Sequence, residues 1–177
     1  LGQRVDAEAK PLGSAIRLDD ARGKAIEPAL AASADGFALA WMELTPDGER
    51  YEVRHRRLAV GGSPQHRSIV VSEDAEADAR TWNSGATVAF CPDGATVVAW
   101  NAEDIDSDAS VVRLRRVGVD ADLSPSVALG AGRVRVADGR SAIAVGPDGR
   151  IAVAWSGDAG FGDSSGVQLS LLVPAST

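Results

Sequence analysis

The sequence is poor in cysteine and in aromatic residues. Among its 177 residues there is one cysteine, Cys91, and aromatic residues make up 5%. One cysteine excludes an internal disulfide and a cysteine cluster around zinc, and we interpret Cys91 as a small buried apolar residue. No apolar run approaches the roughly 20 residues that cross a bilayer. The sequence therefore predicts no membrane insertion.

Positive charge is also in short supply. Lysine and arginine together number 18 against 25 aspartate and glutamate residues, so the formal net charge is -7. A protein of this charge repels phosphate backbones, which argues against nucleic acid as a partner.

What the sequence does contain is a set of landmarks that recurs about every 57 residues. Three Ala-Trp pairs contribute Trp41, Trp100 and Trp155, which are 59 and 55 residues apart. An Asp-Gly dipeptide precedes each pair, at 35–36, 93–94 and 148–149, and a valine stands 12 residues after each tryptophan. Such recurrence indicates one supersecondary unit stacked several times.

Each unit is predicted to contain four short strands. An apolar first strand leads into the Asp-Gly turn, the strongest short-range signal for a hairpin. A second strand rich in Val, Ile, Phe and Trp follows. The expected strands are 29–33, 87–91 and 142–146 (first), 37–42, 96–100 and 151–155 (second), 51–59, 111–119 and 167–173 (third), and 68–72 and 126–129 (fourth). No helical apolar period persists, so we expect no helical layer.

We therefore predict an all-β fold of β-propeller blades, each a four-stranded antiparallel repeat, with a β-sandwich as the alternative. The chain is expected to be a single repeat domain over 1–177. Residues 1–20 would supply the third and fourth strands of a split blade, 21–80 and 81–140 a blade each, and 141–177 the first three strands of the split blade.

This organisation amounts to about three blades, whereas propellers typically have about four to eight. The chain also begins without methionine or a visible leader. We expect either two copies that form a six-bladed ring or further blades from a longer parent chain.

The N-terminal segment resembles a known kind of repeat. Gln3-Arg4-Val5-Asp6-Ala7-Glu8 followed by Pro11-Leu12-Gly13 is similar to the third-to-fourth-strand segment of long bacterial propeller-type repeats. Those repeats belong to large secreted or surface proteins and also carry an Asp-Gly hairpin and a Val-rich strand that ends in Trp. The resemblance implies the fold and an extracellular or cell-envelope location, but no single role.

A ligand site is expected in the central channel or at the end of the sheets where the tryptophans adjoin long acidic loops. The candidate ligand-binding residues are Trp41, Trp82, Trp100 and Trp155, whose indoles would stack on sugars. The alternative for the three repeated tryptophans is that each packs between neighbouring blades as a core residue. Trp82 lies outside the repeat, in a predicted polar loop, and is the better candidate for an exposed aromatic.

Two further groups of charged residues need an interpretation. Asp104, Asp106 and Asp108 alternate along one acidic loop, which makes calcium a candidate cofactor, although a solvated acidic loop has the same pattern. The arginines of the predicted third strands are interpreted as solvated, edge-protecting residues; they are Arg54, Arg56, Arg57, Arg113, Arg115 and Arg116.

No catalytic residue is assigned. Residues 162–166 match the G-x-S-x-G pattern, but a nucleophile elbow requires a strand-to-helix turn, which this sequence does not predict. The function predicted is a non-catalytic binding or scaffolding module of a bacterial envelope or secreted protein, with a glycan or another protein as ligand. The alternatives are the propeller portion of a carbohydrate-active enzyme and a purely structural repeat of a surface assembly.

Overall fold

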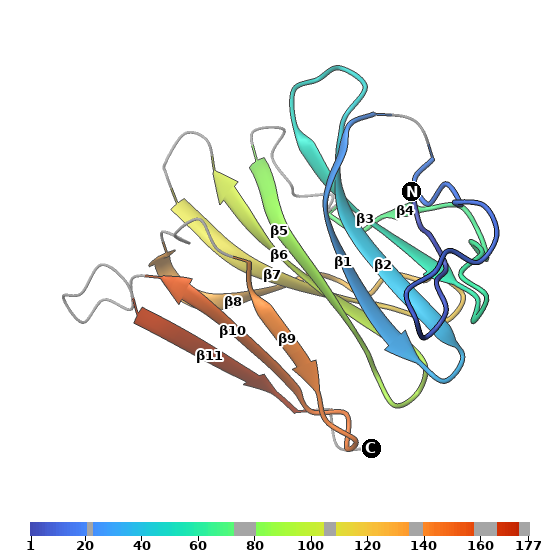
Figure 1. Cartoon of the computed structure of the whole chain (residues 1–177). Helices are drawn as coiled ribbons and strands as arrows, with labels where there is room; N and C mark the ends of the chain where they lie inside the picture. Colours follow the sequence, from blue (N-terminus) through green and yellow to red (C-terminus); the bar gives the residue numbers. More distant parts are fainter. Residues whose placement is uncertain (21–22, 73–80, 105–108, 135–139, 158–165, 174–177) are drawn as a thin grey trace.

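The computed structural model describes residues 1–20, 23–72, 81–104, 109–134, 140–157 and 166–173. Within these ranges every helix or strand assigned is a β-strand, which confirms the all-β expectation. The strands form three antiparallel sheets in which neighbours in sequence are neighbours in space (Figure 1). No helix in the described part of the chain is long and apolar enough to span a membrane.

The three sheets repeat one meander. The first contains β1 (Ala25–Ser33), β2 (Gly36–Leu44), β3 (Tyr51–Leu58) and β4 (Ile69–Val70). The second contains β5 (Thr81–Phe90), β6 (Thr96–Asp104), β7 (Ala109–Val117) and β8 (Val127–Val134). The third contains β9 (Ala142–Val145), β10 (Ile151–Gly157) and β11 (Gly166–Leu172). The first strands of successive sheets touch, since β1 contacts β5 and β5 contacts β9.

The Asp-Gly dipeptides form the hairpins that the sequence predicts. In the second and third sheets Gly94 and Gly149 have φ of 82° and 80°, a conformation that glycine adopts without steric cost. Each donates its N–H to the carbonyl three residues earlier, at 3.0 Å. The first hairpin is tighter, with Gly36 paired directly with Ser33.

The corner between third and fourth strands also recurs, including in the N-terminal segment. Matching isolated bridges join Val5 to Pro11, Leu58 to Pro64, and Val117 to Leu123. In each corner the residue four positions after the first bridge residue has positive φ: 61° at Ala9, 83° at Gly62 and 67° at Ala121. Residues 1–20 therefore have the backbone of a repeat corner and form a hairpin beside the first sheet.

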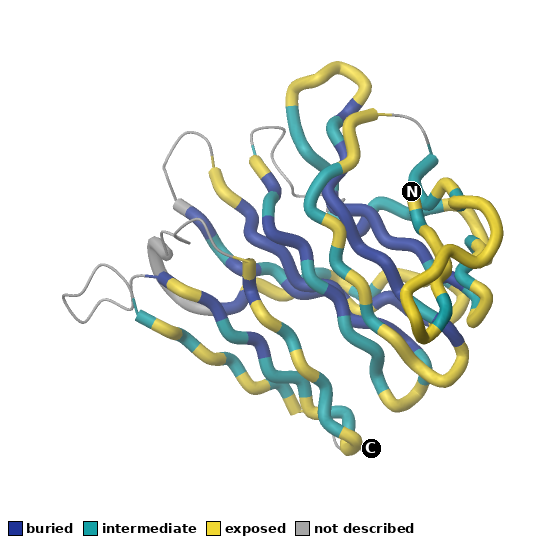
Figure 2. Tube along the Cα trace, viewed as in Figure 1, coloured by how far each residue is buried: buried dark blue, intermediate teal, exposed yellow. Residues whose placement is uncertain are grey.

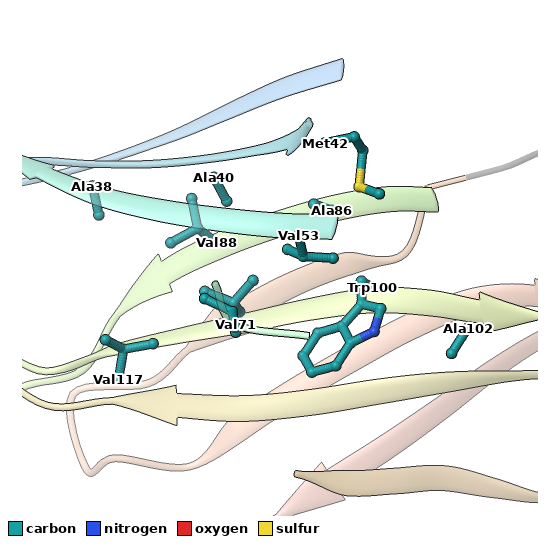
Figure 3. Packing of buried hydrophobic residues seen from close by; sticks show 11 residues of the cluster. Ala38, Ala40, Met42, Val53, Val71, Ala86, Val88, Trp100, Ala102 and Val117 are labelled. Carbon is teal, nitrogen blue, oxygen red and sulfur yellow. The ribbon is translucent and has the colours of Figure 1, made fainter. Parts of the chain in front are cut away.

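Two apolar clusters hold the sheets together. The first lies between the first and second sheets around Trp100, which is 1% exposed (Figure 3). The second lies between the second and third sheets and contains Val112 and Trp155. The repeated tryptophans lie within β2, β6 and β10 and not at strand ends as the sequence suggested, because β2 and β6 continue for three or four residues beyond them.

Buried arginines add polar links between sheets. Arg56 donates from Nη1 to the Leu18 carbonyl at 2.6 Å, and Arg115, 59 positions later, donates from Nη1 to the Val71 carbonyl at 2.7 Å. Their exposed fractions are 4% and 5%, so the interpretation of these residues as solvated is wrong. Arg56 also pairs with Asp20. Although burial raises the pKa of Asp20, hydrogen bonds from Ser68 and Arg56 outweigh it and hold that pKa below the usual value.

Candidate functional site

The site is sought at the end of the sheets where β1, β5 and β9 begin, which we call the loop end. Much of the acidic loop sequence there falls on residues 73–80, 105–108 and 158–165, outside the described residues. The described part contains the β2–β3 turn and the first residues of β1, β3, β5 and β9.

Three of the four candidate tryptophans are core residues in this structure. Trp41, Trp100 and Trp155 are 3%, 1% and 4% exposed, so none has a ring face open to a ligand. The indole N–H of Trp41 donates to Glu43 Oε2 at 3.1 Å. The indole nitrogens of Trp100 and Trp155 are buried without a hydrogen-bond partner among the described residues.

Trp82 is placed differently. It is 39% exposed and lies in β5, whereas the sequence suggested a polar loop. Its ring meets Tyr51 edge to face, with centroids 5.3 Å apart and an interplanar angle of 74°. The adjacent Asn83 donates from Nδ2 to the Tyr51 carbonyl at 2.9 Å. These two contacts tie the start of β5 to the start of β3 and hold the exposed indole in one orientation.

A carboxylate lies next to this indole. In the β5–β6 register Trp82 is paired with Glu103, and Thr81 with Asp104. Residues directly opposite each other in an antiparallel pair project from the same face, so Glu103 projects beside Trp82. Glu103 is exposed, and so is Asp104, which projects from the opposite face of the sheet together with Thr81. The loop end thus combines a flat apolar ring with hydrogen-bond acceptors.

The calcium prediction falls mostly outside the described residues. Asp106 and Asp108 are not described, and Asp104 is an exposed residue at the end of β6. The described residues contain no group of three or more His, Cys, Asp or Glu side chains arranged to hold a metal ion.

A second feature of the loop end was not recognised in the sequence. β1 and β5 carry bulges at matching places, with positive φ at Glu27 (51°) and Gly85 (63°). Glu27 Oε2 accepts the Gly85 N–H at 3.0 Å. Arg140, just before β9, donates to the Pro28 carbonyl at 3.3 Å. The first strands of all three sheets are therefore linked here. No signal in the sequence predicts this link, because a lone glutamate before a proline belongs to no known motif.

Neither histidine offers a base at this end. His55 is fully buried, with Nε2 3.1 Å from Thr96 Oγ1. Burial, helped by the positive charge of Arg57 and by His66, lowers the pKa of His55 to about 3. The ring is therefore neutral at physiological pH and has no access to solvent, which suits a core residue better than a proton carrier.

Two hollows occur away from the loop end. One is a groove of about 360 Å³ between the N-terminal hairpin and the first sheet, lined by Leu18, Leu30, Phe37 and Leu58 among others. The other, about 550 Å³, lies at the Asp-Gly turns of the second and third sheets and includes Cys91 and Asp148. Burial, with the nearby charge of Asp93, raises the pKa of the Cys91 thiol.

Comparison with known proteins supports the fold but not a family or a function. No protein-family model matches the sequence, and no curated protein does either. Among solved structures, an endo-arabinase from Bacteroides thetaiotaomicron is similar, with a TM-score of 0.55 and 10% sequence identity. The match covers 92% of this chain and 61% of that one, so the chain spans less than two thirds of that protein. At this identity the similarity is one of fold.

Proposed function

We propose that this chain is a glycan-binding module built from three β-propeller blades, and that Trp82 is the centre of its binding surface. The observation that carries the proposal is the exposed indole held by Tyr51 and flanked by Glu103. An aromatic face removes the apolar C–H surface of a sugar ring from water. The neighbouring carboxylate of Glu103 would accept hydrogen bonds from its hydroxyls and set its orientation.

The blade assignment is supported by the way the sheets meet. Each sheet is a sequential antiparallel meander whose first strand contacts the first strand of the next sheet. This contact supports the assignment, because the inner strands of neighbouring propeller blades also meet around a common axis. The similarity in fold to an endo-arabinase supports a carbohydrate as the ligand class, since such sheets are used there by a carbohydrate-active protein.

The test is a binding measurement on the intact chain. We expect arabino-oligosaccharides or another panel of soluble glycans to bind with a change in tryptophan fluorescence, because Trp82 is the most exposed of the four tryptophans, the other three being buried. Trp82→Ala should abolish the heat of binding, while Trp82→Phe should retain part of it. Both variants should lose the fluorescence change, because each lacks the indole that reports binding. Val119→Ala is the matched control, since Val119 is an exposed apolar residue beyond the far end of β7. Binding that survives Trp82→Ala would overturn the proposal.

A catalytic role is the second candidate, and the fold similarity to an endo-arabinase favours it. Glycoside hydrolysis ordinarily needs a pair of carboxylates about 5–9.5 Å apart. The described residues of the inner strands contribute one carboxylate at the loop end, that of Glu27. Release of reducing sugar from arabinan that disappears in Glu27→Gln, with glycan binding retained, would establish this alternative. Binding without turnover would exclude it.

A further inference from the structure

The third sheet exposes apolar side chains that its counterparts bury. Val53 and Val112 stand 12 residues after the repeated tryptophans of the first and second sheets, and both are 0% exposed. Val167 holds the same place in the third sheet and is 84% exposed. Leu169 and Leu171, two and four residues on, are 60% and 68% exposed. Alternate residues of a strand share a face, so these three form one stripe, which we call the β11 face. Figure 2 shows exposed and partly buried residues alternating along β11.

The same face is covered in the other two sheets by the next sheet along the chain. Val53 lies in the cluster that contains Trp100 of the second sheet, and Val112 lies in the cluster that contains Trp155 of the third sheet. The surface that covers a valine of this kind is therefore the tryptophan-bearing face of a neighbouring sheet. Among the described residues no further sheet lies beyond β9–β11.

The composition of the β11 face fits a buried position better than a solvated one. Leu171 stands where the first and second sheets have Arg57 and Arg116, and Leu169 stands where the first sheet has His55. In an end sheet that faced water, charged residues at these positions would prevent association with other chains. This sheet instead presents contiguous apolar surface, which marks an interaction site.

The chain also has an incompletely covered tryptophan-bearing face. It belongs to the first sheet and carries Trp41 and Phe37 on β2 and Leu30 on β1, where Leu30 is 61% exposed. The N-terminal hairpin covers only part of it through the contact between Arg56 and Leu18. Between them lies the groove of about 360 Å³ lined by Leu30, Phe37 and Leu58. We call this the hairpin groove.

We propose that the β11 face of one chain docks into the hairpin groove of a second copy of the same chain, and that the reverse contact completes a symmetric dimer. Two copies related by a two-fold axis make this contact twice, as two-fold symmetry requires. The contact repeats between chains the packing of Val53 on Trp100 within one chain. Six sheets then surround one axis, and both exposed apolar faces are covered.

The mass of the intact chain in solution is the first test. Light scattering coupled to size exclusion should give twice 18.2 kDa at micromolar concentration. Leu169→Glu and Leu30→Glu should each weaken dimerisation by about 30-fold or more, the effect of losing a central interface side chain. Val119→Glu is the matched control, since Val119 is 56% exposed but lies at the β7–β8 corner, away from both the β11 face and the hairpin groove. A monomer with the unaltered sequence would overturn the proposal.

A second experiment tests whether the β11 face of one chain contacts the hairpin groove of the other. A mixture of the Leu169→Glu and Leu30→Glu chains retains one intact contact per heterodimer, because each variant keeps the surface that the other has lost. Mixing should therefore recover dimer that neither variant forms alone, while circular dichroism confirms that both remain folded. A Leu30→Glu chain that stays fully dimeric would show that the β11 face associates with itself. Assembly that appears only with additional polypeptide from a longer parent chain would also contradict the proposal.

Discussion

At the scale of single residues, one residue type serves two purposes. Trp100 and Trp82 differ by 18 positions, yet Trp100 is 1% exposed between two sheets and Trp82 is 39% exposed at the loop end. The difference comes from their place in the sheets, since Trp100 lies in the middle of β6 and Trp82 at the start of β5.

This contrast predicts unequal losses of stability when each tryptophan is replaced. Trp100→Ala should lower the free energy of unfolding by about 3–5 kcal/mol, because it leaves a large cavity in the cluster around Val53 and Met42. Trp82→Ala should lower it by no more than about 1 kcal/mol, because the indole is partly solvated. Urea denaturation followed by circular dichroism measures both. Equal losses in the two variants would mean that Trp82 is structural.

A buried histidine predicts sensitivity to acid. The pKa of His55 is lowered from 6.5 to about 3 in the fold, so below pH 6.5 the unfolded chain binds a proton that the folded chain excludes. Stability should therefore fall as pH drops from 6.5 towards 3, by up to about 1.4 kcal/mol per pH unit. Measurements between pH 6.5 and about 5.5 keep the contribution of the carboxylates small, because Asp and Glu of the unfolded chain protonate mainly below about pH 5.

The repeat itself supplies the control for that experiment. Leucine stands at the equivalent places, Leu114 and Leu169, so a His55→Leu, Thr96→Val double variant replaces the buried pair with apolar residues. It should remove most of the pH dependence between pH 6.5 and about 5.5. His66→Asn changes an exposed histidine and should leave the slope as it was. A slope unchanged in the double variant would contradict the assignment.

At the scale of elements, the hairpins and the buried arginines distinguish the repeats. Gly36 lies five residues before its tryptophan, and Gly94 and Gly149 lie six before theirs, which corresponds to the tighter first hairpin. Arg56 and Arg115 reach a preceding segment, while the third sheet has Ser170 at the same place.

The two hairpin types predict that a glycine-to-alanine substitution lowers stability by different amounts. A Cβ at Gly36 would overlap the Leu58 carbonyl oxygen, whereas at Gly94 its nearest neighbour would be Val119 Cγ2 at 3.7 Å. Gly94→Ala should cost about 1 kcal/mol from backbone strain alone. Gly36→Ala should cost clearly more, because the backbone of β3 must also shift. Thermal melts of the two variants, compared with each other, decide this.

Replacing a buried arginine should lower the free energy of unfolding more than replacing an exposed one. Arg115→Met removes a donor to the Val71 carbonyl and should cost about 1–3 kcal/mol. Arg150→Met removes an exposed ion pair with Asp148 and should cost much less stability than Arg115→Met, because solvent screens the exposed pair. Denaturant titrations should show the larger loss of stability for Arg115→Met at both low and high salt. A larger loss at Arg150 would contradict it.

At the scale of the whole molecule, the chain is an array of sheets with two unlike ends. One end is the hairpin beside the first sheet, and the other is the apolar β11 face (Figures 1 and 2). If the two ends pair between copies, stability depends on concentration by mass action. The thermal midpoint should rise as chain concentration is raised through the dimerisation range, and Leu169→Glu should abolish that rise. A midpoint independent of concentration would argue against assembly.

Local features of the sequence predicted much of this fold. The strands, the Asp-Gly turns and the repeated corner depend on short-range chemistry, such as the tolerance of Gly94 for positive φ. The similarity of residues 1–5 to later third strands predicted that a repeat corner follows them. The structure has that corner, with a bridge between Val5 and Pro11. Strand lengths were less well predicted, because β5 extends to Thr81 through a bulge that no residue pattern signals.

The burial of polar and aromatic side chains was decided by tertiary structure. The sequence by itself determined a repeated all-β chain, because hydrophobic periodicity and turn residues act between near neighbours. It did not determine that Arg56 and His55 are buried or that Trp82 is the exposed indole. Those outcomes depend on which sheet covers which face, and residues far apart in the chain, such as Leu18 with Arg56 and Tyr51 with Trp82, are brought together only when the sheets pack.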